Sequence, residues 1–203
     1  MDTLIDSYPL PSGGQLELHI DESPQDPRED DNLGTMVCWH RSYRLGDRNG
    51  FGEPNDFMGW WEDEGGEDGV LLPLYLYDHS GITMSTQPFS CPWDSGQVGY
   101  IYATREKILE EYKKEIEEEW SRSAYLGIKQ SIPKEVQNRV RALLVSEVEL
   151  YDCYLRGDVY GYIITDADGD HQDSCWGFYG SVETSGILEY LTDEARHVLE
   201  GAR

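Results

Sequence analysis

An excess of negative charge constrains this chain more than any motif within it. The 203 residues include 40 acidic side chains against 16 basic ones, which gives a formal net charge of -24 at pH 7. Like charges repel in a compact state, so this excess adds nothing to folding stability. The charge must have another cause, and three are open: imitation of a polyanion, solvation in a salty cell, or cation binding.

Composition nevertheless predicts a folded protein. Hydrophobic residues make up 38% of the chain and include 14 tyrosines and 6 tryptophans, which is too much apolar mass for a disordered chain. The length favours a single domain over 1–203. The N-terminus is acidic, and no apolar run approaches the ~20 residues that span a membrane. We therefore expect a cytoplasmic protein without a membrane partner.

Periodicity predicts the secondary structure. Apolar and β-branched stretches predict strands over 15–20, 33–40, 70–79, 81–87 and 97–104, followed by a hairpin over 158–166 and 173–180. Helical spacing predicts helices over 105–121, 133–157 and 192–200. Thr104 and Thr192 are expected to cap two of them, and Pro73 to mark an edge position or a bulge.

This order of elements predicts an α+β fold, with an antiparallel sheet and two longer helices packed on one face. Residues 1–14 are expected to form an irregular lead-in. Residues 41–69 are dense in glycine and acidic side chains, and we expect them to form one long acidic excursion.

The four cysteines, at positions 38, 91, 153 and 175, contain no CxxC pair and are expected to be reduced. A zinc site could in principle be formed by Cys38, His40, Cys91 and Cys175. Their spacing lacks the paired-ligand pattern of structural zinc sites. We predict no metal and no cofactor.

An Asp-rich segment offers a second metal hypothesis. Asp166, Asp168 and Asp170 fit the first ligand positions of a calcium loop, but His171 and Gly177 stand where that loop needs Gly and Glu. An Asp-Gly step between two predicted strands is typical of a tight turn, which is the reading we favour.

A small enzyme is one alternative function. Cys91 could be a nucleophile with His79 or His40 as its base, beside Asp94. Reactive cysteines lie near cations or helix N-termini, whereas Cys91 lies between prolines in an acidic neighbourhood, so a structural role is favoured. Asp94 also begins an Asp-Ser-Gly motif, but an aspartic protease needs a second copy of it.

The pair Trp60–Trp61 precedes the acidic segment 62–68. Aromatic rings beside carboxylates are typical of protein-binding surfaces, where the ring anchors and the charge steers. The alternative is a loop that folds back, with both rings in the core and a solvated tip.

Several long strings resemble one group of proteins. DNLGTMVCWHRSYRLGD (31–47), ITMSTQPFSCPWDSGQVGYIY (82–102), YDCYLRGDVYGY (151–162) and DSCWGFYG (173–180) resemble small acidic proteins encoded by bacteriophages and conjugative elements. The resemblance spans most of the chain and implies a mobile-element context, with no catalytic residues. This chain departs from the group in being more acidic and in having 11 arginines against 5 lysines.

The leading hypothesis is an anti-defence protein, anti-restriction or anti-CRISPR, that acts in the host cytoplasm as an acidic mimic of nucleic acid. Its partner would be a host defence protein with a basic nucleic-acid-binding groove. Direct nucleic-acid binding is disfavoured by repulsion from phosphate, and a homodimer is plausible. The predicted binding residues are Asp21, Glu22, Asp26, Glu29, Asp30, Asp31, Trp60, Trp61, Glu62, Asp63, Glu64, Glu67, Asp68, Glu111, Glu115, Glu118 and Glu119.

Adaptation to high salt remains the other alternative, with the charge serving solvation and the function lying elsewhere. The bias toward arginine over lysine fits it. It predicts carboxylates spread evenly over all exposed faces, whereas mimicry predicts that they cluster.

Overall fold

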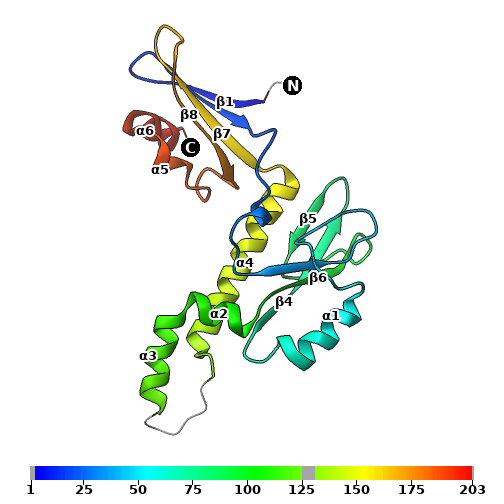
Figure 1. The fold of residues 1–203 in the computed structure, drawn as a ribbon. Coiled ribbons are helices and arrows are strands. Elements are labelled where there is room, and N and C mark those ends of the chain that lie inside the picture. Colours follow the sequence, from blue (N-terminus) through cyan, green and yellow to red (C-terminus); the bar gives the residue numbers. More distant parts are fainter. Residues whose placement is uncertain (1–2, 125–130, 203) are drawn as a thin grey trace. The chain divides into compact units, whose positions relative to one another are not determined.

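The computed structural model describes residues 3–124 and 131–202 and has an α+β fold (Figure 1). The predicted class is confirmed, but the strands form two antiparallel sheets of four strands each. The chain divides into two compact units: unit 1 comprises Met1–Glu29 and Leu150–Arg203, and unit 2 comprises Asp30–Glu149. Compact units can still unfold as one domain, so the single domain over 1–203 stays a prediction.

Unit 1 contains the sheet with strand order β1-β2-β7-β8. The strands are β1 (Leu4–Pro9), β2 (Gln15–Ile20), β7 (Val159–Thr165) and β8 (His171–Tyr179). The expectation of an irregular segment over 1–14 is wrong, because Leu4–Pro9 pairs with β2 along its length. The Pro- and Gly-rich residues that suggested irregularity form the hairpin turn, where Gly13 has a φ of 96° and donates to the Leu10 carbonyl at 2.9 Å.

Two short helices cover one face of this sheet, α5 (Ile187–Tyr190) and α6 (Asp193–Gly201). Thr192 caps α6 as predicted, because its Oγ1 accepts from the Ala195 N–H at 3.3 Å. The buried core between sheet and helices consists of Leu10, Leu16, Leu18, Tyr162, Ile164, Phe178, Ile187, Leu191, Ala195 and Leu199.

Unit 2 contains the sheet with strand order β3-β6-β4-β5. The strands are β3 (Thr35–Cys38), β4 (Val70–Asp78), β5 (Ile82–Ser85) and β6 (Ser95–Ala103). Alternate residues of β4 are buried, as the period of two requires. Pro73 lies outside the Tyr75–Asp78 stretch that pairs with β5, and the register of β4 with β6 shifts between Leu74 and Tyr75. The prediction for Pro73 is therefore confirmed.

The helix predicted over 105–121 forms as two, α2 (Arg105–Glu111) and α3 (Lys113–Ala124). Tyr112 separates them, with φ and ψ of -105° and 21°, and Figure 1 shows the two helices at an angle. Thr104 caps α2, since its Oγ1 accepts from the Lys107 N–H at 3.5 Å. The predicted helix over 133–157 is α4 (Lys134–Arg156), the long helix in Figure 1.

Helices contact both faces of the unit 2 sheet. Leu144 of α4 lies beside Ile101, since both side chains adjoin Gly34. Ile101 and Tyr102 point to opposite faces because side chains alternate along a strand. On the Tyr102 side, Phe57 of α1 (Pro54–Trp60) has its ring centroid 5.2 Å from that of Tyr102. The expected pair of longer helices on one face is not confirmed.

Within residues 3–124 and 131–202, no helix has the length and hydropathy needed to cross a bilayer.

Candidate functional site

The predicted acidic residues are divided between the two units. Asp21, Glu22, Asp26 and Glu29 belong to unit 1, and the remaining predicted residues belong to unit 2. The structure therefore places these residues relative to one another only within each unit.

In the 21–31 loop, two carboxylates hold the loop's own backbone. Asp21 accepts from the Ser23 N–H at 3.0 Å, and Asp26 accepts from the Arg28 N–H at 2.9 Å. Glu22 and Glu29 are exposed. The loop was predicted as a binding element, and half of its four unit 1 carboxylates stabilise its turns instead.

Trp60 and Trp61 lie in an aromatic cluster on the sheet. Their ring centroids are 5.9 and 6.2 Å from that of Phe57, and both are 5.6 Å from that of Tyr102. Both indoles are partly buried. This arrangement resembles the folded-back alternative, except that both rings stay partly exposed and do not enter the buried core.

The tip beyond the two indoles is a single π-helical turn, Trp61–Gly65. Its three carboxylates, Glu62, Asp63 and Glu64, are exposed. None of them makes an ion pair or a hydrogen bond with another described side chain. They remain available to a partner.

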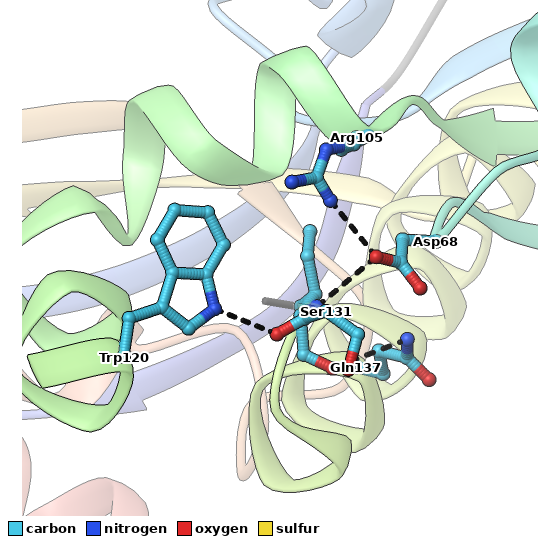
Figure 2. Close-up of polar contacts among 6 residues, drawn as sticks. Asp68, Arg105, Trp120, Ser131 and Gln137 are labelled. Carbon is cyan, nitrogen blue, oxygen red and sulfur yellow. Dashed lines mark hydrogen bonds and ion pairs between the residues drawn. The ribbon is translucent and has the colours of Figure 1, made fainter. Parts of the chain in front are cut away.

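Asp68 joins separate elements of unit 2 rather than facing solvent (Figure 2). Its Oδ2 accepts from the Arg105 guanidinium at 2.8 Å and from the Ile132 N–H at 3.2 Å. Nearby, the Trp120 indole N–H donates to the Ser131 carbonyl at 2.8 Å, and Arg105 lies 5.5 Å from the centroid of the Trp120 ring. Asp68 is therefore a structural residue that links the start of α2 to the segment before α4.

The helix face chosen from sequence is less negative than its glutamates suggest. Glu115 pairs with Arg139 of α4, and this contact raises the pKa of the Arg139 guanidinium. Lys113 and Lys114 are exposed on the same helix. Residues 105–124 hold seven acidic and five basic side chains, so their net charge is only -2. Glu118 is exposed and Glu119 is partly buried.

Asp31 and Glu111 line the same concavity, which has a volume of about 450 Å³. Glu110, Glu147 and Lys107 line it as well. Lys107 donates to the Leu33 carbonyl at 3.3 Å, so a cation already lies within this acidic hollow.

Most of the charge excess lies in unit 1. Its 83 residues contain 18 acidic and 4 basic side chains, all four of them arginine, for a net charge of -14. The 120 residues of unit 2 have a net charge of -10. None of the described carboxylates of unit 1 is buried.

One end of the unit 1 sheet gathers carboxylates from two segments, both against the Leu10–Gly14 turn. The β7–β8 turn contacts it, since a Cβ on Gly13 would lie 3.1 Å from that of Ala167. The first turn of α6 contacts it through Glu194, which accepts from the Ser12 N–H at 2.6 Å. We call this group the acidic end; it comprises Asp166, Asp168, Asp170, Asp193 and Glu194.

The sequence interpretation missed the acidic end as a surface. Asp166 and its neighbours were assigned to a plain turn, and Asp193 and Glu194 to the start of a helix. Both assignments are confirmed, because Asp166 Oδ1 accepts from the N–H groups of Asp168 and Asp170 at 3.0 and 2.9 Å. No local signal in the sequence shows that the two segments meet.

Three residues of the enzyme hypothesis converge, in an order unsuited to thiol catalysis. Asp94 Oδ2 lies 3.7 Å from Cys91 Sγ and 3.4 Å from His79 Nδ1, so the carboxylate stands next to both groups. A thiol nucleophile needs its base beside the sulfur, and here the group beside the sulfur is the Asp94 carboxylate. His40 instead accepts from the N–H groups of Ser42 and Tyr43.

Among the described residues, no group of three or more His, Cys, Asp or Glu side chains has a geometry that could hold a metal ion. In the 166–174 segment, Asp166 accepts from backbone N–H groups and from the Gln172 amide at 2.8 Å, so its carboxylate holds the turn.

One buried acid was not singled out from the sequence. Glu147 of α4 is 9% exposed, and its Oε1 accepts from the N–H groups of Leu33 and Gly34 at 3.0 and 3.1 Å. It fixes the entry to β3 and has a structural role.

In comparisons with known proteins, no family model, no curated protein and no solved structure matches this chain.

Proposed function

We propose that the protein is an acidic decoy that occupies the nucleic-acid-binding groove of a host defence protein. The observation that supports this most is the concentration of charge in unit 1, with -14 on 83 residues and no buried described carboxylate. A charge retained at the surface and gathered on one unit serves recognition better than it serves uniform solvation.

The acidic end is the proposed binding surface. Arg196 is the nearest arginine in sequence, and its guanidinium donates to the carbonyls of Leu188 and Leu191 at 2.7 and 3.3 Å. Its Nη1 lies 3.9 Å from Asp193, which is exposed. Asp168 and Asp170 are exposed in the turn that Asp166 holds. Their carboxylates can therefore face a basic groove without any change of backbone.

Such a decoy binds by electrostatic steering. Complementary charge speeds association, and added salt weakens it because the exposed charges are screened over ~8 Å at physiological ionic strength. No catalytic step is required, and the partner's own affinity for phosphate supplies the selectivity.

The test is inhibition of purified restriction endonucleases and CRISPR effector complexes, measured as DNA binding at 50 and 300 mM NaCl. We expect inhibition of at least one enzyme that weakens at the higher salt. Polyglutamate of similar net charge serves as the control for charge alone. A folded protein that leaves the whole panel active at 50 mM NaCl would refute the proposal.

Matched variants locate the surface. Asp168→Asn, Asp170→Asn and Asp193→Asn together remove three charges from the acidic end. Glu62→Gln, Asp63→Asn and Glu64→Gln remove three exposed charges from the π-helical turn. The first triple variant should inhibit about tenfold less, since each exposed charge contributes roughly 0.3–1 kcal/mol. A larger loss of inhibition with the second triple variant would indicate that the binding surface is the tip predicted from sequence.

A further inference from the structure

The clearest exception to the acidic character of this protein is a concavity lined by arginines. Arg41, Arg44 and Arg48 line a hollow of about 830 Å³ in unit 2. All three are exposed, and none forms an ion pair with a described residue. Asp47 is the acidic residue that lines the same hollow. Guanidinium groups left without partners amid an excess of carboxylates point to an anionic ligand.

The backbone that carries these arginines is fixed to the sheet. Gly46 forms a bridge with Val37 and has a φ of 68°, and Asp47 accepts from the Met36 N–H at 2.8 Å through its Oδ2. The loop between β3 and this bridge is thereby closed, with Leu45 buried beneath it. Arg41 and Arg44 extend from this closed loop and Arg48 follows it directly, which lowers the entropy lost on binding.

His40 presents an oriented donor in the same place. Its Nδ1 accepts from the backbone N–H groups of Ser42 and Tyr43 at 3.3 and 3.2 Å, so the ring proton lies on Nε2. The ring stacks on Tyr43 with centroids 4.9 Å apart and an interplanar angle of 13°. The Tyr43 hydroxyl donates to Asp78 at 3.3 Å, which holds this flat pair in position.

A second hollow, of about 490 Å³, adjoins the first through shared lining residues Trp39, His40 and Arg41. Its wall also includes Trp93, which is 90% exposed, and the carboxylates of Asp78 and Asp94. An indole this exposed costs free energy in water, and its planar face suits stacking against a heteroaromatic ring.

We propose that these two hollows form a binding site for a nucleoside polyphosphate. The base stacks on Trp93, the sugar hydroxyls donate to Asp94, and the phosphates bind the guanidinium groups of Arg41, Arg44 and Arg48. Each hollow, at about 490 and 830 Å³, is within the roughly 300–1,000 Å³ that small-molecule sites occupy. A polynucleotide is disfavoured, because the net charge of -24 repels a long row of phosphates.

The site lies in unit 2 and uses no residue of the acidic end, so its test is independent of the decoy proposal. ATP is the probe, titrated by calorimetry without Mg²⁺ at low salt. Tripolyphosphate, adenosine and a 12-nucleotide DNA strand are titrated alongside it. We expect ATP to bind at least tenfold more tightly than tripolyphosphate or adenosine, and the DNA strand to bind more weakly than ATP.

Three variants of exposed residues test the assignment. Arg41→Gln and Arg44→Gln should each raise the Kd for ATP at least tenfold, and Trp93→Leu should raise it severalfold. Arg141→Gln, at an exposed position of α4 that lines neither hollow, should leave the Kd unchanged. Circular dichroism confirms that each variant is folded.

Three results would overturn the proposal. The first is the absence of ATP binding at 5 mM. The second is equal affinity for tripolyphosphate and ATP. The third is displacement of ATP by the DNA strand when the concentration of DNA nucleotides is lower than that of ATP.

Discussion

A buried carboxylate at position 147 shows how one residue fixes a strand. Glu147 is 9% exposed and accepts from two backbone N–H groups, those of Leu33 and Gly34. Gly34 leaves room for this contact, since a Cβ there would lie 2.7 Å from Glu147 Oε2. The charge on Glu147 is matched by local donors and has no part in the proposed decoy surface.

Glu147→Gln is therefore expected to destabilise the protein. The amide retains one acceptor oxygen but places an NH₂ group toward backbone donors, at a cost of about 2 kcal/mol. Urea unfolding measures the loss, and Glu149→Gln, at an exposed position on the same helix, is the control. Equal stability of the two variants would contradict the structural role.

Tyr162 predicts a pH dependence at alkaline pH. Burial and the hydrogen bond that its hydroxyl donates to Asp173 at 2.9 Å raise the pKa of Tyr162 well above its usual value near 10. The neutral form is thus favoured in the folded state, and the contribution to stability is full below pH 10. It is lost as pH rises, because the unfolded chain then releases the proton first.

Tyr162→Phe tests this linkage with an internal control. At pH 7 the variant should be about 1 kcal/mol less stable, since it lacks the hydrogen bond. Above pH 10 the free energy of unfolding should fall more steeply for the native protein than for the variant, by up to about 1.4 kcal/mol per pH unit. The difference in stability between the two proteins therefore narrows. A gap that stays constant from pH 7 to 11 would contradict the shifted pKa.

At the scale of elements, Asp68 connects parts that the local sequence leaves separate. Its carboxylate contacts Arg105 at the start of α2 and the Ile132 N–H before α4 (Figure 2). Asp68 has a φ of 56°, a conformation that Asn also tolerates. Substitution by Asn therefore removes the charge without straining the backbone.

Asp68→Asn should lower the free energy of unfolding by about 1–2 kcal/mol, since it weakens a partly buried, charge-assisted contact. Asp63→Asn, an exposed change of the same type five residues earlier, should alter it by less than about 0.5 kcal/mol. Thermal and urea unfolding give both values. A larger effect of the Asp63 variant would show that the tip, and not Asp68, supports the fold.

At the scale of the whole molecule, the uneven charge predicts an uneven response to salt. Unit 1 has a net charge of -14 on 83 residues, and unit 2 has -10 on 120. Self-repulsion grows with charge density and is screened by salt. Raising NaCl from 20 to 500 mM should therefore stabilise unit 1 more than unit 2.

Hydrogen exchange read by mass spectrometry measures this, because peptides report on each unit separately. Peptides from β7, β8 and α6 should gain more protection than peptides from β4 and β6. Equal gains in protection for peptides of both units, together with global unfolding at 20 mM NaCl, would favour adaptation to high salt over the decoy function.

Local chemistry in the sequence determined the class of this fold and most of its elements. The period of two in Val70–Asp78, the helical spacing over 134–156 and the caps Thr104 and Thr192 depend on neighbours within a few residues. The net charge, too, is a property of composition alone, and it already argued against a nucleic-acid partner. These features could be read without any long-range contact.

Only the tertiary structure decided how those elements are shared between two sheets. Leu18 of β2 pairs with Tyr162 of β7, although the two residues are far apart in the sequence. Such a pairing depends on strand register and burial, which no local pattern encodes. The same holds for the candidate sites: Asp68 and Asp63 look alike in sequence, but a distant arginine makes the first structural. Side-chain function here follows from partners far along the chain, and folding alone brings those partners together.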